Sequence, residues 1–223
     1  MTWYEDEIYQ LESRVRALSA VPEDSHSNGV VLNGAVAGRS TAILDEDAHP
    51  VVFYGSSSIR LWITLATNFP DVDVLNLGFG GSTLEACVWF FERVLVPASP
   101  ESVVFYAGDN DLGDGRTPEE VHRFFCAFAQ KMNQQLPGVP VSFLTIKISP
   151  ARWNIAHKIR RTNELIAQEI SEYPNFQVVD TTGPLLDTAG RPRRELFEND
   201  GLHLSPAGYR VWQQVLQQQP GIF

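Results

Sequence analysis

Cysteine is scarce in this sequence, which contains only Cys87 and Cys126 among its 223 residues. Two cysteines form one disulfide at most, and they cannot supply the ligands of a four-cysteine zinc site. His26, His49, His122 and His157 are scattered without the spacing typical of metal ligands. The sequence therefore predicts neither a disulfide scaffold nor a metal site.

Basic residues are also few, with 17 lysines and arginines against 27 acidic residues and a net charge of −10. Proteins that bind nucleic acids neutralise backbone phosphates with lysine and arginine. This deficit argues against nucleic-acid binding and disfavours strongly anionic substrates. Neutral and cationic small molecules remain open as ligands.

Long hydrophobic runs are absent, because no apolar stretch approaches the roughly 18 residues of a membrane helix. The first six residues, Met1 to Asp6, lack the basic and apolar regions of a signal peptide. Hydrophobic residues make up 43% and charged residues 20%, as in globular proteins. We expect a cytoplasmic protein without a membrane span.

Short apolar runs rich in β-branched and aromatic residues predict buried strands at 51–54, 72–77, 103–106, 141–148 and 176–179. Segments with helical spacing lie between them. One begins at Thr117, which is a suitable N-cap, with Pro118 at the first helical position. Glu120 completes a capping box with Thr117. Strands that alternate with helices imply parallel strands joined by right-handed crossovers. The sequence predicts a three-layer α/β/α sandwich with about five parallel strands.

The first 48 residues do not fit this alternation. Residues 3–18 are typical of an amphipathic helix, with an apolar stripe formed by Tyr4, Ile8, Leu11, Val15 and Leu18. Residues 21–48 are rich in Gly, Ser, Asn and Asp, which favours a long loop or a weak hairpin. We expect one main domain, 49–223, with the segment 1–48 packed on it.

Polar, glycine-containing turns follow the first three predicted strands, at Gly55–Ser58, Gly78–Thr83 and Gly108–Asp111. In open parallel sheets, ligands bind beyond the carboxyl ends of the strands. Asp200 and His203 lie near the C-terminus, just before Ser205, where we expect the last helix to begin. A serine, a histidine, a carboxylate and backbone donors are therefore predicted to meet at one edge of the sheet.

These four segments, in this order, resemble the blocks of the SGNH (GDSL-type) hydrolase superfamily. Residues 53–62, with Ser56 at the usual aspartate position, are similar to a variant of the first block. Gly81 matches the glycine of the second block, Asn110 the asparagine of the third, and Asp200 with His203 the closing pair. The resemblance covers roughly residues 50–217 and leaves the N-terminal segment unexplained. It implies a flavodoxin-like fold and serine-dependent hydrolysis of esters or thioesters without a cofactor.

The family's nucleophile lies two residues after the block's glycine, which selects Ser57. A serine hydroxyl needs a base to take its proton, a role that falls to His203, with Asp200 fixing the tautomer of the imidazole. The resemblance implies an oxyanion hole formed by the N–H groups of Ser57 and Gly81 and by the Asn110 side-chain amide.

Two aromatic residues are predicted to bind substrate. Phe79, between Gly78 and Gly80, is the first candidate for a pocket wall, and Trp153, after the fourth predicted strand, is the second. We expect most of the tryptophans to belong to the core instead.

Each of these residues also has an ordinary structural interpretation. Ser57 is a suitable helix N-cap, the glycines and Asn110 are common in tight turns, and His203 fits a solvated position beside a helix start. Because four separate turns would all have to imitate a site, the joint pattern favours function. The sequence predicts a serine esterase or acylhydrolase that cleaves small acyl esters through an acyl-enzyme. A carbohydrate O-acetylesterase and a non-catalytic α/β ligand-binding module are the alternatives.

Overall fold

The sheet at the centre of the molecule has five parallel strands in the order β2-β1-β3-β4-β5. The structure is a computed structural model that describes residues 1–19 and 49–223. Its strands are β1 (Val51–Gly55), β2 (Val74–Gly78), β3 (Ser102–Tyr106), β4 (Val141–Leu144) and β5 (Phe176–Val179). All five predicted strands are confirmed. The loop or hairpin predicted for residues 21–48 lies outside the described residues.

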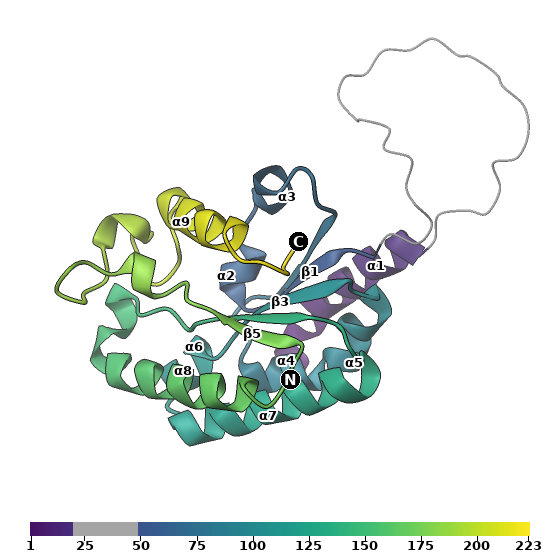
Figure 1. The fold of residues 1–223 in the computed structure, drawn as a ribbon, viewed down its shortest axis with the longest axis horizontal. Coiled ribbons are helices and arrows are strands. Elements are labelled where there is room, and N and C mark those ends of the chain that lie inside the picture. Colours follow the sequence, from purple (N-terminus) through teal and green to yellow (C-terminus); the bar gives the residue numbers. More distant parts are fainter. Residues whose placement is uncertain (20–48) are drawn as a thin grey trace, which may run out of the picture.

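Helices cover both faces of this sheet, as Figure 1 shows. The longer ones are α1 (Glu5–Ser19), α7 (Pro118–Gln135), α8 (Ala156–Ile170) and α9 (Pro206–Gln217). The shorter ones are α2 (Ser57–Arg60), α3 (Leu65–Asn68), α4 (Leu84–Trp89), α5 (Phe91–Val94) and α6 (Asp109–Gly113). Short 3₁₀ helices lie at Thr2–Tyr4, Val96–Ala98, Pro150–Ile155, Gly183–Leu185 and Arg194–Leu196.

Alternating side chains on the strands divide the core into two layers. In β1, Val52 and Tyr54 pack in a cluster with α1, α4, α5, α7 and α8. Val51 and Phe53 point to the opposite face and pack with α2, α3 and α9. Every residue of β1 is buried, because both faces of a parallel sheet are covered by helices. The predicted α/β/α sandwich is confirmed.

Local signals set two of the helix starts. Thr117 and Glu120 form the predicted capping box at the start of α7, and the Ser205 hydroxyl accepts the N–H of Gly208 at the start of α9. The fourth strand is shorter than predicted, because its neighbour β5 ends at Val179. Beyond that point the backbone of Ile146 hydrogen-bonds to the Asn163 side chain instead of to a strand.

The N-terminal helix packs on the flank of the same domain. Tyr4, Ile8, Leu11 and Val15 are buried in the core layer that α5 shares. Arg93, on α5, forms ion pairs with Glu5 and Glu12 of α1. These four side chains of the apolar stripe are therefore covered by their own chain.

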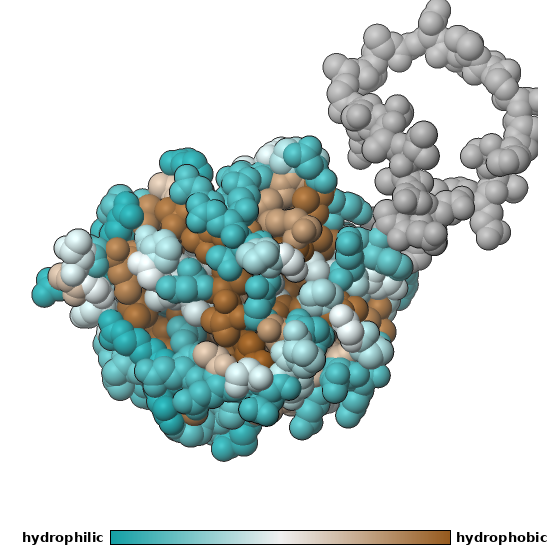
Figure 2. Space-filling view, in the orientation of Figure 1, coloured by the Kyte–Doolittle hydropathy of each residue, from teal (hydrophilic) through white to brown (hydrophobic). Residues whose placement is uncertain are grey.

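The surface is polar over much of the face seen in Figure 2. Hydrophilic side chains cover the outward surfaces of α7 and α8, at the bottom of this view, and hydrophobic surface shows between the two helix layers. Within residues 1–19 and 49–223, no helix is both long enough and apolar enough to cross a membrane.

Candidate active site

The register of the sheet brings three of the predicted site segments to one edge. Gly55, at the end of β1, pairs with Gly78 of β2 on one side and with Tyr106 of β3 on the other. Ser57, Gly81 and Asn110 follow these three strand ends by two to four residues. The turns that carry them therefore lie next to one another at the carboxyl edge.

Gly55 and Gly78 allow the first turn to fold tightly. Gly55 has a φ of 137°, and a Cβ atom there would lie 1.9 Å from the carbonyl oxygen of Tyr106. A Cβ at Gly78 would lie 2.3 Å from the backbone nitrogen of Arg60. Only glycine allows such a close approach. The chain therefore turns directly from β1 into α2, with Ser57 as the first residue of that helix.

The three adjacent serines have different surroundings. The Ser57 hydroxyl lies 3.1 Å from Nε2 of His203. The Ser58 hydroxyl is buried and accepts a hydrogen bond from Lys147 Nζ at 3.0 Å. The Ser56 hydroxyl is also buried, and no described residue hydrogen-bonds to it. Within the described chain, only Ser57 of the three meets a base.

His203 is held by Asp200 in the loop before α9. Its Nδ1 lies 2.6 Å from Asp200 Oδ2, while Asp200 Oδ1 accepts the N–H groups of Leu202 and His203. Partial burial opposes ionisation of the carboxyl, but these hydrogen bonds lower the pKa of Asp200 to about 2. The carboxylate is thus ionised near neutral pH and accepts a hydrogen bond from Nδ1–H, which leaves Nε2 as the acceptor facing Ser57.

Asn110 is joined to the Gly81 turn by a hydrogen bond to Ser82, the residue that follows Gly81. The Asn110 amide donates to the carbonyl oxygen of Ser82 at 3.0 Å. Arg152 donates to Asn110 Oδ1 at 3.4 Å and so fixes the orientation of the amide. Gly81 has a φ of 64°, and no atom lies within 4 Å of the position a Cβ would take. The Gly81 turn is therefore open on that side.

The N-terminal segment also contacts this turn. Tyr4 donates its hydroxyl to the carbonyl oxygen of Gly81 at 3.0 Å. Glu7 accepts the N–H of Gly80 at 2.7 Å. Residues more than 70 positions apart thus hold the turn, a contact that no local sequence pattern indicates.

A buried charged network that the sequence analysis missed lies next to the serine turn. Lys147 Nζ lies 2.7 Å from Asp109 Oδ2 and 3.0 Å from the hydroxyls of Ser58 and Tyr106. The Lys147 and Asp109 side chains are 1% and 5% exposed. Burial disfavours the charged carboxylate, yet Lys147 lowers the pKa of Asp109. Lys147 lies in the segment predicted as the fourth strand. A charged residue between Ile146 and Ile148 is the sequence feature that could have indicated a buried charge there.

Two hollows lie near the turns that carry the candidate site residues. One of about 590 Å³ lies on the Gly81 and Asn110 side, lined by Met1, Trp3, Tyr4, Thr83, Glu85, Asp114, Gly115, Arg116 and Glu120. The other, of about 320 Å³, is lined by Pro150, Trp153, Arg191 and Pro192. It lies beside the His203 loop, because the N–H of Ala151 donates to the carbonyl oxygen of Gly201.

The predicted substrate-binding aromatics lie in different places. Trp153 is 44% exposed in the smaller hollow. Phe79 has no exposed surface and packs against Tyr4, Tyr54 and Phe90. Its assignment as a pocket wall is wrong, because its side chain points into the core and has no surface that a substrate can touch.

The expectation that most tryptophans belong to the core is also wrong, because only two of the five are buried. Trp3, Trp89 and Trp153 are exposed, whereas Trp62 and Trp212 are buried. Cys87 is buried in α4, and both cysteines are free thiols.

Comparison with solved structures finds the same fold in many proteins. A Streptococcus pneumoniae protein, provisionally named a platelet activating factor, matches with a TM-score of 0.74 and 19% identity, over 97% of this chain and 94% of that one. A GDSL-like lipase from Bacteroides thetaiotaomicron matches with a TM-score of 0.63 and 20% identity, over 76% of this chain and 86% of that one. A variant of an acetyl-xylooligosaccharide esterase from Geobacillus matches with a TM-score of 0.61 and 14% identity, over 76% and 93% of the two chains. At these identities the likeness shows the fold.

Family membership comes from the sequence. A comparison with curated proteins gives no significant match. The family model of GDSL-like lipases and acylhydrolases matches residues 53–211, which include Ser57, Gly81, Asn110, Asp200 and His203. Because this match spans well over half of the chain, the protein belongs to the GDSL-like lipase/acylhydrolase family.

Proposed function

We propose that the protein is a serine esterase that cleaves small acyl esters through an acyl-enzyme on Ser57. The observation that carries this proposal is the relay from Ser57 Oγ to His203 Nε2, at 3.1 Å, and from His203 Nδ1 to Asp200, at 2.6 Å. Membership of an acylhydrolase family supports the same chemistry. A binding module has no need of a serine, a base and a carboxylate in this order.

In the first half of the reaction, Ser57 Oγ attacks the ester carbonyl carbon and gives its proton to His203 Nε2. Asp200 stays ionised and stabilises the imidazolium, in keeping with a pKa of about 2 for this carboxyl. The tetrahedral intermediate collapses when the alcohol leaves with the proton from Nε2. In the second half, a water gives a proton to His203 Nε2 while its oxygen attacks the acyl carbon. The bond from that carbon to Ser57 Oγ then breaks, the acid leaves, and Oγ takes the proton back from Nε2.

The negative oxygen of the tetrahedral intermediate needs hydrogen-bond donors. We assign this role to the N–H groups of Ser57 and Gly81 and to the side chain of Asn110. The Asn110 amide has two N–H groups, and one already donates to Ser82, next to Gly81. The other is then available to the oxyanion, while Arg152 keeps the amide from turning over.

A carbohydrate O-acetylesterase is the second candidate, favoured by the smaller hollow. Trp153 presents an exposed ring there, beside Arg191 and two prolines. An amphipathic aromatic ring next to a polar side chain suits a ligand with both apolar and hydroxyl faces, such as a sugar. One structural neighbour is an acetyl-xylooligosaccharide esterase, and the acyl group cleaved here would then be acetyl.

The test is hydrolysis of p-nitrophenyl acetate, butyrate and octanoate, and of an acetylated xylo-oligosaccharide, by the wild type and single-serine variants. We expect the short esters to turn over and Ser57→Ala to lose at least about 10³-fold in kcat. Ser56→Ala is the matched control, because no described residue hydrogen-bonds to its buried hydroxyl.

The outcomes separate the candidates. Release of acetate from the oligosaccharide with a higher kcat/KM than from p-nitrophenyl acetate would favour the sugar esterase. If the folded wild type hydrolyses none of these esters, a binding module replaces the enzyme. If Ser57→Ala keeps wild-type turnover, the nucleophile is assigned wrongly.

A further inference from the structure

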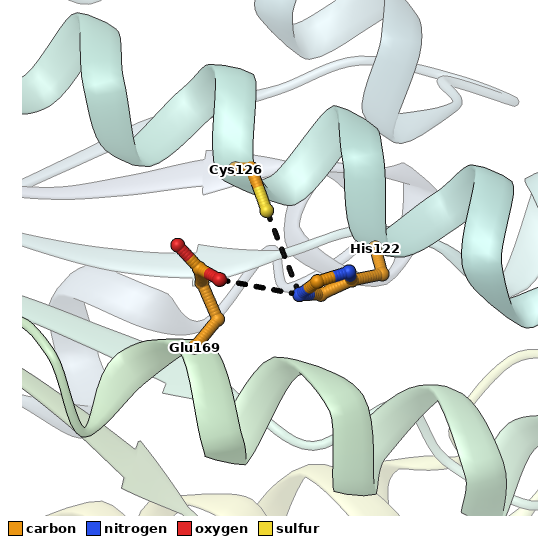
Figure 3. Close-up of side chains that lie close together, drawn as sticks. All are labelled: His122, Cys126 and Glu169. Atoms are coloured by element: carbon orange, nitrogen blue, oxygen red, sulfur yellow. Dashed lines mark hydrogen bonds and ion pairs between the residues drawn. The ribbon is translucent and has the colours of Figure 1, made fainter.

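Three potential metal ligands meet between α7 and α8, outside the proposed active site. His122 and Cys126 lie one helical turn apart on α7, and Glu169 faces them from α8 (Figure 3). His122 Nε2 lies 3.5 Å from Cys126 Sγ and 3.4 Å from Glu169 Oε2. The three ligand atoms all lie within 4.8 Å of one another.

We propose that His122, Cys126 and Glu169 bind one zinc ion that fastens α7 to α8. Zinc in proteins is tetrahedral, with bonds of about 2.3 Å to sulfur and about 2.0–2.2 Å to nitrogen and oxygen. These bonds place a sulfur and a nitrogen ligand about 3.6 Å apart, and a nitrogen and an oxygen ligand about 3.4 Å apart. The separations of 3.5 Å and 3.4 Å match the two edges that His122 Nε2 forms with the other two ligand atoms.

The chemistry of the three groups also suits this ion. Imidazole, thiolate and carboxylate are the ligand types that zinc takes together, whereas magnesium and calcium prefer oxygen alone. A thiolate and a carboxylate balance the two charges of the ion. Burial, together with the neighbouring Glu169, raises the pKa of the Cys126 thiol to about 11. A bound cation would reverse this effect, because it deprotonates a coordinating thiol.

Access and support are both present at the cluster. The His122 and Glu169 side chains are 26% and 24% exposed, so an ion can enter and a water can complete the tetrahedron. The Tyr173 hydroxyl donates to Glu169 Oε1 at 3.4 Å, which leaves Oε2 directed at His122. Hydrogen bonds of this kind to a ligating carboxylate orient it and strengthen metal binding.

Because His122 and Cys126 share one helix and Glu169 belongs to the next, the ion would link two parallel crossover helices of one layer. Neither helix carries Ser57, Asp200 or His203. The ion would therefore act on stability and take no part in ester hydrolysis. The i, i+4 spacing of His122 and Cys126 is visible in the sequence, but Glu169, over 40 residues further on, is brought near only by the fold.

The test uses tag-free, reduced, metal-stripped protein and Co²⁺ as a spectroscopic probe, followed by Zn²⁺. We expect one Co²⁺ per chain, with thiolate-to-cobalt charge-transfer absorption and tetrahedral d–d bands. One equivalent of Zn²⁺ should abolish both and raise the melting temperature. Cys126→Ser and His122→Gln should weaken binding by at least about 100-fold, since loss of an outer-sphere partner alone costs about 10–100-fold.

The matched control is His157→Gln, an exposed histidine on α8 outside the cluster, which should bind like the wild type. All three altered side chains have exposed surface, so we expect the variants to fold. Circular dichroism verifies this before titration. Absence of the charge-transfer band in the wild type would overturn the proposal. So would an unchanged zinc-induced rise in melting temperature in Cys126→Ser, because the ion would then sit elsewhere, for example on Asp200 and His203.

Discussion

Asp111 is a buried carboxyl that ties α6 to α4, since its Oδ2 accepts the N–H of Leu84 at 2.8 Å. Burial raises the pKa of Asp111 to about 6, whereas an unfolded aspartate titrates near about 3.9. Between these values the folded state holds a proton that the unfolded state has released. The Asp111 contribution to the free energy of unfolding therefore falls as the pH rises from about 4 to about 6, and is level above that.

Asp111→Asn should remove this pH dependence, because an amide does not titrate and can still accept the Leu84 N–H. The free energy of unfolding of the variant, relative to the wild type, should rise by about 2–3 kcal/mol between pH 4 and pH 7. Urea denaturation of both proteins at pH 4, 5, 6 and 7 measures the difference. If the free energies of unfolding of variant and wild type differ by the same amount at all four pH values, the raised pKa of Asp111 in the folded state is contradicted.

Lys147 and Asp109 form an ion pair that is almost completely buried. Removing one partner of such a pair leaves the other charge uncompensated, at a cost of about 3–5 kcal/mol. Lys147→Met should therefore destabilise the protein by that amount, and Lys147→Met with Asp109→Asn should recover a large part of it. Urea denaturation of the two single variants and the double variant gives the coupling energy. If the two effects simply add, the pair does not act as a unit.

At the scale of the element, α1 and the 3₁₀ turn before it link the N-terminus to the turn with the proposed oxyanion glycine. Tyr4 and Glu7 bond the backbone of Gly81 and Gly80 respectively. Removal of an oxyanion donor typically costs about 10²–10³ in turnover, and loosening one costs less. Tyr4→Phe should thus lower kcat by about 3- to 10-fold and leave KM nearly unchanged.

Steady-state kinetics on p-nitrophenyl acetate checks this prediction. Tyr9→Phe is the matched control, since Tyr9 lies on α1 with its side chain exposed and away from the glycine turn. A fall in melting temperature without any change in kcat would make Tyr4 a purely structural residue and contradict a positioning role.

At the scale of the whole molecule, the strand order brings the candidate site residues to one edge of the sheet, and this part was predictable. Buried strands give apolar runs, and glycine turns with polar residues mark their carboxyl ends, so the sequence predicted which turns meet at this edge. Within those turns, the resemblance to the family's blocks selected Ser57, Gly81 and Asn110 as candidates. Side-chain direction and distant partners were not predictable. The Phe79 side chain points into the core. Lys147 forms an ion pair with Asp109 because the strands that precede them, β4 and β3, are neighbours in the sheet. These contacts depend on packing, which local patterns do not record.

The account as a whole depends on one activated serine, and covalent labelling tests it most directly. An alkyl fluorophosphonate, which mimics the tetrahedral intermediate of ester hydrolysis, should add one phosphonyl group per chain. Peptide mass spectrometry should place that group on Ser57 in the wild type and in Ser56→Ala, and His203→Ala should react at least about 10³-fold more slowly. Labelling of Ser56 or Ser58, or no labelling of the folded wild type, would contradict the account.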